Sequence, residues 1–210
     1  REYFVSEKRA KLALDAALHT RRAEAALAPG DVCLYLGIPF CPTRWASCSF
    51  VSQAVEKSMG LIEPFLEALW RDIEATAEAV RRASLRPVAL YMGGGTPTTL
   101  SAGQLDELCA RLEENFDLSA LREYTVEAGR PDTIARDKLE TLRAHGVRRV
   151  SVNPQSMSDR VLELSGRGHT ARDVAEASGM VKAAGFKLIL QMMTGLPGSD
   201  EESDVETARR

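Results

Sequence analysis

Short apolar segments alternate with longer segments of helical periodicity along most of this chain of 210 residues. We expect strands over residues 32–38, 88–92, 124–127, 149–153 and 186–193. Helices are expected over residues 2–27, 61–83, 101–115, 134–145 and 170–185. Capping boxes are expected at Ser101 with Gln104 and at Thr170 with Asp173, and Ser199 with Glu202 is expected to open a further helix. Strands that are separated by helices pair in parallel through crossovers, so the sequence predicts an α/β fold on a parallel sheet.

The unusual residues of the chain fall where the expected strands end. They are Cys41, Gly93–Gly95, Glu127, Gln155 and Gly195–Pro197. A (β/α) barrel places its active site at the carboxyl ends of its strands. A doubly wound open sheet places its ligands there too, so this pattern alone does not separate the two folds.

Composition and charge narrow the class of protein. The chain is 44% hydrophobic and 27% charged, with a formal net charge of -3, which gives no support for a nucleic-acid groove or a membrane-binding basic patch. No apolar run approaches the roughly 18–20 residues that span a bilayer. Four cysteines are too few for a disulfide scaffold, which favours a reducing cytoplasm. Together with the net charge and the short apolar runs, this predicts a cytoplasmic protein without nucleic-acid or membrane partners.

Cys41 and Cys48 lie seven residues apart behind the first expected strand. Thiolates at short spacing on a loop can converge on one metal or cluster, although such a pair also arises by chance or as core residues. Trp45 stands between them, four residues after the first cysteine. Its indole N–H donates a hydrogen bond but has no available lone pair, so Trp45 cannot bind a metal.

Polar groups at the other strand ends have two interpretations each. The triple glycine followed by Thr96 and Pro97 lets a ligand approach the backbone, or forms a turn. Glu127 accepts hydrogen bonds from ribose hydroxyls or an ammonium group, or forms a salt bridge to Arg130 or Arg149. Gln155 and Arg167 could reach one ligand, or be a loop hydrogen bond and a solvated charge.

Together these motifs resemble the radical S-adenosylmethionine (SAM) superfamily, and more narrowly the oxygen-independent coproporphyrinogen III oxidase (dehydrogenase) family. The resemblance covers essentially the whole chain. It is carried in order by residues 34–44 (LYLGIPFCPTR), 93–98 (GGGTPT), 125–132 (TVEAGRPD), 153–157 (NPQSM) and 195–198 (GLPG).

The resemblance implies a partial (β/α)6 TIM-like barrel, truncated after about five strands. Residues 1–30 would be a helical lead-in and residues 31–210 the barrel core of a longer protein. The implied cofactors are a 4Fe-4S cluster and SAM. Cys41 and Cys48 match the first and third cluster ligands, and Trp45 occupies the second-ligand position. The implied SAM contacts are Tyr35, Gly94, Gly95, Thr96, Glu127, Gln155 and Arg167.

The implied function is a step of porphyrin and haem biosynthesis, the oxidative decarboxylation of coproporphyrinogen III propionates through a 5′-deoxyadenosyl radical. A flavodoxin or ferredoxin would supply the electron, and the cofactor the difficult chemistry. Because Trp45 replaces the second cysteine, the alternative is an inactive or haem-chaperone-like relative that binds tetrapyrrole or SAM. A third possibility is a βα barrel with a chance cysteine pair.

Overall fold

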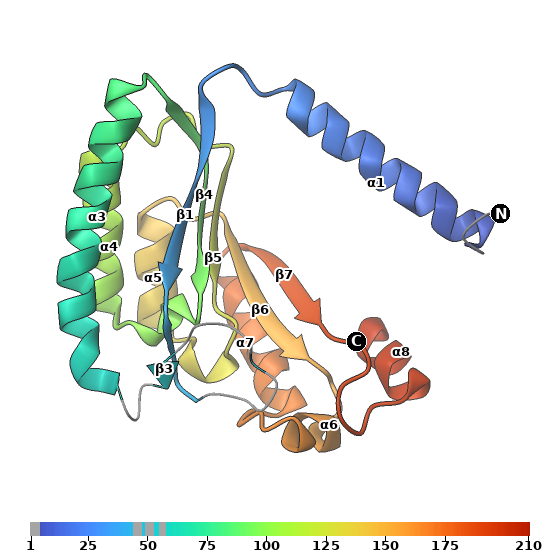
Figure 1. Ribbon diagram of the computed structural model, residues 1–210. Helices are drawn as coiled ribbons and strands as arrows, with labels where there is room; N and C mark the ends of the chain where they lie inside the picture. Colours follow the sequence, from blue (N-terminus) through green and yellow to red (C-terminus); the bar gives the residue numbers. More distant parts are fainter. Residues whose placement is uncertain (1–4, 44–47, 49–52, 55–57) are drawn as a thin grey trace.

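The computed structural model describes residues 5–43, 48, 53–54 and 58–210 (Figure 1). Trp45 therefore lies outside the described residues. Five strands form one sheet in the order β1-β4-β5-β6-β7, and every neighbouring pair is parallel. Their bounds are β1 Asp31–Ile38, β4 Arg86–Gly94, β5 Glu123–Glu127, β6 Arg149–Gln155 and β7 Lys187–Met192. The predicted five-stranded parallel sheet is confirmed.

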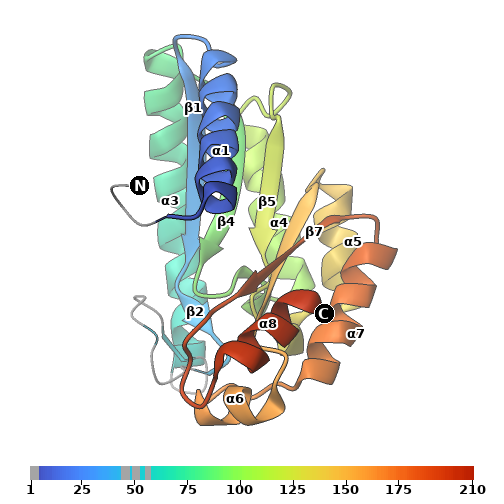
Figure 2. The same cartoon turned by 90° about the vertical axis from the view of Figure 1, so that its right-hand side faces the viewer.

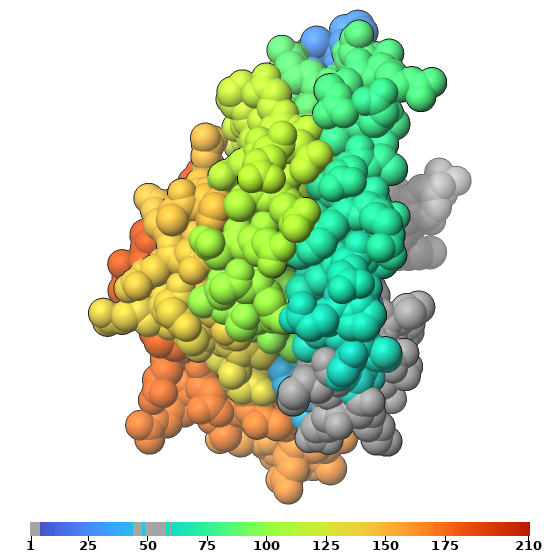
Figure 3. All heavy atoms as spheres, turned by 90° about the vertical axis from the view of Figure 1, so that its left-hand side faces the viewer, coloured from blue at the N-terminus to red at the C-terminus, as the bar shows by residue number. Residues whose placement is uncertain are grey.

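The helices that connect these strands cover one face of the sheet, and the other face is open (Figures 1 and 2). They are α3 Ile62–Arg82, α4 Ala102–Asn115, α5 Arg136–Ala144 and α7 Ala171–Ala183. Figure 3 shows α3, α4 and α5 side by side on this outer surface. One-sided helices on a parallel sheet that follows chain order form a partial (β/α) barrel.

The hydrophobic core lies between the sheet and these helices. Strand β4 shows how the sequence divides the two faces, because side chains alternate along a strand. Leu90 and Met92 point outward and are fully buried under the helices, together with Leu108 of α4. Tyr91 and Gly93 lie on the opposite, inner face, where the cavity described below is found. The packing thus leaves the inner face for polar groups.

Shorter elements complete the fold. Strands β2 (Phe40–Cys41) and β3 (Gln53–Ala54) form a separate parallel pair that the sequence did not predict. The 3-10 turns η1, η2 and η3 span Met59–Leu61, Pro97–Thr99 and Pro131–Thr133, and helices α6 and α8 span Asp159–Leu164 and Glu201–Arg209.

Helix α1, Glu7–Ala25, begins at the N-cap Ser6 and buries none of its residues. It extends away from the sheet on the open side (Figure 1). Among the described residues, no helix combines the length and hydrophobicity that a membrane span requires.

Two predicted capping boxes are confirmed and one is wrong. Ser101 caps α4 with Gln104 at the third position, and Thr170 caps α7 with Asp173 in the same way, as expected. Helix α8 instead begins after Asp200, whose side chain accepts a hydrogen bond from the backbone N–H of Ser203. The backbone N–H of Ser199 donates to Leu196 O, so Ser199 still belongs to the preceding turn and the helix starts one residue later than predicted.

Candidate functional site

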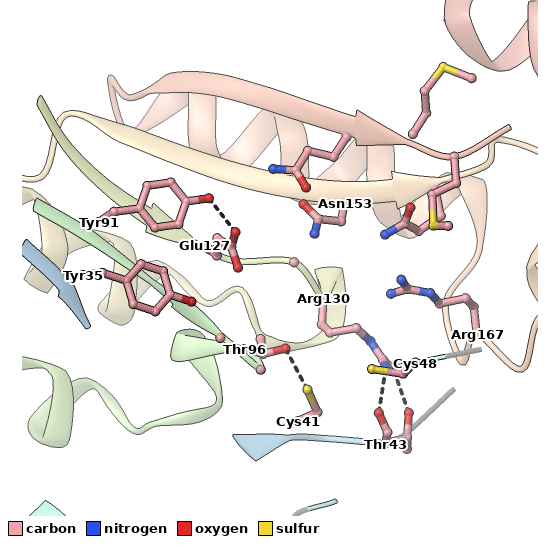
Figure 4. A pocket seen from close by; sticks show the side chains of 17 residues that line it. Tyr35, Cys41, Thr43, Cys48, Tyr91, Thr96, Glu127, Arg130, Asn153 and Arg167 are labelled. Carbon is pink, nitrogen blue, oxygen red and sulfur yellow. Dashed lines mark hydrogen bonds between the residues drawn. The ribbon is translucent and has the colours of Figure 1, made fainter. Parts of the chain in front are cut away.

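A cavity of about 360 Å³ opens at the carboxyl ends of the strands, on the inner face of the sheet (Figure 4). All the cluster and SAM residues that the resemblance implies line it, although they lie far apart in the sequence, whereas Gly93 and Gly195–Pro197 do not. The implied residues are Tyr35, Cys41, Cys48, Gly94, Gly95, Thr96, Glu127, Gln155 and Arg167. The structure thus brings these residues together in one place, and the role of each stays a prediction.

The triple glycine packs against the strand that carries Cys41. The backbone N–H groups of Gly95 and Thr96 donate to the carbonyl oxygens of Ile38 and Phe40, each at 2.7 Å. A Cβ on Gly95 would lie 2.6 Å from Phe40 O, so no larger residue fits without displacing the backbone. The predicted close approach is therefore real, but its partner in the structure is the protein's own backbone. It also places Thr96 Oγ1 3.5 Å from Cys41 Sγ.

Glu127 stands at the end of β5 and receives a hydrogen bond from the Tyr91 hydroxyl, 2.5 Å from Oε1 (Figure 4). Burial raises the pKa of Glu127, and the Tyr91 hydroxyl opposes that rise because it stabilises the ionised carboxylate. The alternative salt bridge to Arg130 or Arg149 is wrong among the described residues. Arg149 pairs with Glu123 at 2.8 Å, and Arg130 makes the contacts described next.

Arg130 is a site residue that the sequence did not predict as such. Only 4% of it is exposed, yet it carries a charge. Its Nη1 and Nη2 donate to the backbone oxygen and Oγ1 of Thr43, at 3.2 and 2.9 Å (Figure 4). Its Nε donates to Asp132 Oδ1 at 3.3 Å. Arg130 thereby ties the segment just after Cys41 to the loop that follows β5.

Arg167 and Gln155 also line the cavity. Burial, and after it the charge of Arg130, lowers the pKa of Arg167 to about 10, whereas the thiols of Cys48 and Cys41 oppose this shift. Gln155 adopts a left-handed φ of 63°, which is uncommon outside glycine and concentrates at functional sites. Its buried Oε1 has no hydrogen-bond partner among the described residues, which leaves an acceptor for a bound ligand.

Comparison with known proteins places this site in a family. The model of the radical SAM superfamily matches residues 36–210, which is most of the chain. The chain belongs to the radical SAM superfamily. That superfamily uses a 4Fe-4S cluster and SAM, so the thiols and the hydrogen-bonding groups that line the cavity can each be compared with what these two cofactors need.

Several relatives of this radical SAM chain carry names from tetrapyrrole metabolism. Oxygen-independent coproporphyrinogen-III oxidase-like protein HemZ of Bacillus subtilis is 37% identical over 80% of this chain and 34% of its own length. Heme chaperone HemW of Lactococcus lactis is 33% identical over 82% of this chain and 44% of its own. The chain therefore spans less than half the length of these curated relatives.

A solved structure supports the same fold. Coproporphyrinogen III oxidase HemN of Escherichia coli superposes with a TM-score of 0.76 and 29% identity, over 85% of this chain and 40% of that one. The five-stranded parallel sheet with helices outside is thus the partial barrel of a radical SAM protein. Because relatives are named both as oxidases and as heme chaperones, membership alone does not select one activity.

The two cofactors fit the chain differently. The unpartnered Gln155 Oε1 and the inward-facing Glu127 suit the hydroxyl and ammonium donors of SAM. The cluster needs three thiolates, and the described thiols that line the cavity are Cys41 and Cys48. Among the described residues, no group of three or more His, Cys, Asp or Glu could hold a metal ion. With Trp45 in the sequence between them, the donor set does not fit a three-thiolate cluster.

The other two cysteines do not complete the set. Cys33 is exposed on β1 and does not line the cavity. Cys109 is buried on α4, where its Sγ lies 3.5 Å from the Tyr124 hydroxyl. Helix α4 belongs to the outer layer, so Cys109 is a small residue of the hydrophobic core.

Proposed function

We propose that this chain is the SAM-binding core of a cytoplasmic protein of tetrapyrrole metabolism, related to oxygen-independent coproporphyrinogen III oxidases. The observation that carries the proposal is the convergence of every expected SAM contact on one cavity, beside Cys41 and Cys48. The tetrapyrrole part rests on the names of the relatives HemZ, HemW and HemN. A flavodoxin or ferredoxin is the proposed electron donor.

The chain's own residues would divide the work of binding. Glu127 accepts hydrogen bonds through an oriented carboxylate, and Gln155 through a buried amide oxygen that needs a donor. Arg167 adds a positive charge beside the thiols. Bound SAM and a cluster would supply the radical chemistry of the oxidase family, whose reacting group is a substrate propionate.

A second candidate function is favoured by Trp45. Without a third thiolate the chain would bind SAM or a tetrapyrrole and carry out no radical chemistry, as a haem-chaperone-like protein. The cavity contacts described above are made between residues other than residue 45. The two candidates therefore share the binding site and differ in the cluster.

SAM binding is tested by equilibrium dialysis with radiolabelled SAM on the whole chain. Glu127→Gln removes the acceptor charge, and we expect at least tenfold weaker binding, because hydrogen bonds to charged groups contribute about 1.5–3 kcal/mol. Glu123→Gln is the matched control, since Glu123 lies on the same strand but does not line the cavity. If both variants bind SAM like the wild type, the proposed site is wrong.

The cluster is tested by anaerobic reconstitution of the wild type beside Trp45→Cys and Trp45→Ser. We expect about four iron atoms per chain only in the cysteine variant, because only it restores a third thiolate. The serine variant controls for the loss of the indole. Formation of 5′-deoxyadenosine from SAM should follow the iron content. Equal iron and equal product in the wild type and Trp45→Cys would mean that Trp45 does not prevent cluster assembly.

A further inference from the structure

Tyr91 and Glu127 form a hydrogen-bonded pair on the inner face of the sheet. Glu127 is one of the expected SAM contacts, whereas Tyr91 is not. Tyr91 comes from the middle of β4, and Glu127 from the end of the neighbouring strand β5. The 2.5 Å hydrogen bond runs from the phenolic hydroxyl to Oε1 of the carboxylate. A hydrogen bond with one ionised partner is stronger and shorter than a neutral one, so this contact holds the carboxylate firmly.

The position of the other carboxylate oxygen, Oε2 of Glu127, depends on the absence of a side chain at Gly93. A Cβ built on Gly93 would lie 3.1 Å from Glu127 Oε2 and 2.9 Å from the Tyr91 ring. Glycine at this position is therefore what lets the carboxylate lie against the strand beside the phenol. Tyr91 and Gly93 are two residues apart, which puts them on the same face of β4. One residue fixes Glu127 by a hydrogen bond and the other by leaving room for it.

Tyr91 is itself held from two sides. The Tyr35 ring stacks on it with centroids 6.0 Å apart and an interplanar angle of 10°. The Gln191 side chain of β7 lines the same cavity beside the Tyr91 hydroxyl. The Tyr91 ring is thus placed between groups from β1 and β7, and its hydroxyl donates to a carboxylate on β5.

We propose that Tyr91 is a positioning residue, which presents the ionised Glu127 carboxylate to hydroxyl or ammonium donors of the ligand. This inference rests on the proposed binding of SAM in the cavity. Tyr91 acts through Glu127. Removal of the Tyr91 hydroxyl therefore leaves the Glu127 carboxylate present, but neither fixed in place nor stabilised in its charged form. The hydroxyl matters here, because a phenylalanine keeps the ring contacts and loses only the hydrogen bond.

Binding of SAM to Tyr91→Phe, as a function of pH, tests this role. We expect about tenfold weaker binding at neutral pH, the loss of one hydrogen bond to a charged group. We also expect the acid limb of the binding curve to move to higher pH, because Tyr91 lowers the pKa of Glu127 and its loss raises that pKa. A merely structural defect would weaken binding without moving this limb.

Other titratable or charged groups near the Glu127 carboxylate also affect the pH dependence of SAM binding. The Tyr35 hydroxyl is sensitive to the charge of Glu127, and further titratable or charged groups line the same cavity. These are Arg130, Arg167, Cys41 and Cys48. All of them remain in Tyr91→Phe, so a shift between the two curves reports the lost hydrogen bond.

A double-mutant cycle separates positioning from direct contact. In a Glu127→Gln background, Tyr91→Phe should weaken binding no further, because the group through which it acts is gone. Gly93→Ala should weaken binding as well, since the added Cβ would crowd both the Tyr91 ring and the Glu127 carboxylate. Tyr124→Phe is the matched control, because that hydroxyl contacts Cys109 outside the cavity.

The outcomes distinguish this inference from the proposed function. Absence of SAM binding in the wild type, together with a thermal unfolding midpoint that added SAM does not shift, would overturn both. Wild-type affinity and an unmoved acid limb in Tyr91→Phe, together with weak binding in Glu127→Gln, would overturn the positioning role alone. Equal effects of Tyr91→Phe with and without Glu127 would also overturn it, because Tyr91 would then act on its own.

Discussion

Replacement of Arg130 by methionine is the sharpest test of how the segment after Cys41 is held in place. The guanidinium is almost fully buried and makes two hydrogen bonds to Thr43 and one to Asp132. Methionine has a similar length and fills the same space with apolar atoms, but it donates nothing. The variant therefore removes the tie between two loops that are 87 residues apart in the chain.

The contacts of Arg130 set the size of the effect. Each bond to Thr43 from a charged donor contributes about 1.5 kcal/mol at the lower end of the usual range, so the two give about 3 kcal/mol. The bond to Asp132 adds little, because that carboxylate is half exposed. Loss of Arg130 also relieves Arg167 of a repulsive neighbour. We expect a net loss of about 2 kcal/mol for Arg130→Met and about 1 kcal/mol for Thr43→Val.

Two measurements on the whole chain check this expectation. Urea unfolding gives the free energy, and timed alkylation with mass spectrometry gives the reactivity of each thiol. Cys41 and Cys48 should react several-fold faster in Arg130→Met, whereas the exposed Cys33 serves as an internal reference and should not change. Arg149→Met is the matched control, because Arg149 pairs with Glu123 away from the cavity. Wild-type stability together with wild-type alkylation in Arg130→Met would refute the reasoning.

Two further predictions concern the outer layer and the glycine segment. Burial alone would lower the pKa of His145, but hydrogen bonds and charges from Asp106 and Glu113 outweigh it and raise that pKa. This stabilisation is full below about pH 6.5 and is lost as the pH rises through the raised pKa, so His145→Gln should cost more stability at pH 6 than at pH 9 in urea unfolding; an equal cost at both would contradict it. Gly95→Ala should lower stability by about 1–3 kcal/mol, because its Cβ would press on a backbone oxygen of β2, and an unchanged urea midpoint would contradict this close contact.

The general position of the site follows from the sequence for a simple reason. Parallel strands that alternate with helices all end at the same edge of their sheet, so residues just after strands meet whatever their separation in the chain. Cys41, Glu127 and Gln155 were predicted on that basis, and all three line one cavity. The order of the elements was enough, because no knowledge of strand register or side-chain direction was needed.

Contacts that depend on register were beyond such reasoning. The bond from Arg130 to Thr43 needs the loop after β5 to lie against the segment after β2, and nothing local in either segment encodes that. Tyr91 was visible beside the triple glycine, but its pairing with Glu127 needs the alignment of β4 with β5. The predicted start of α8 was wrong for a local reason. Ser199 and Asp200 are both good N-cap residues, and the backbone N–H of Ser199 is used in the preceding turn, so Asp200 caps the helix.

The binding groups and the cluster ligands are therefore separable in this chain. Glu127 is fixed by Tyr91 and the glycine segment by the backbone near Phe40, and none of these contacts uses residue 45. A change of cysteine to tryptophan at that position would remove a thiolate donor, whereas those contacts are made by other residues. A radical SAM chain can in this way lose its cluster before it loses its SAM cavity, so binding and iron content must be measured separately to say which function this protein keeps.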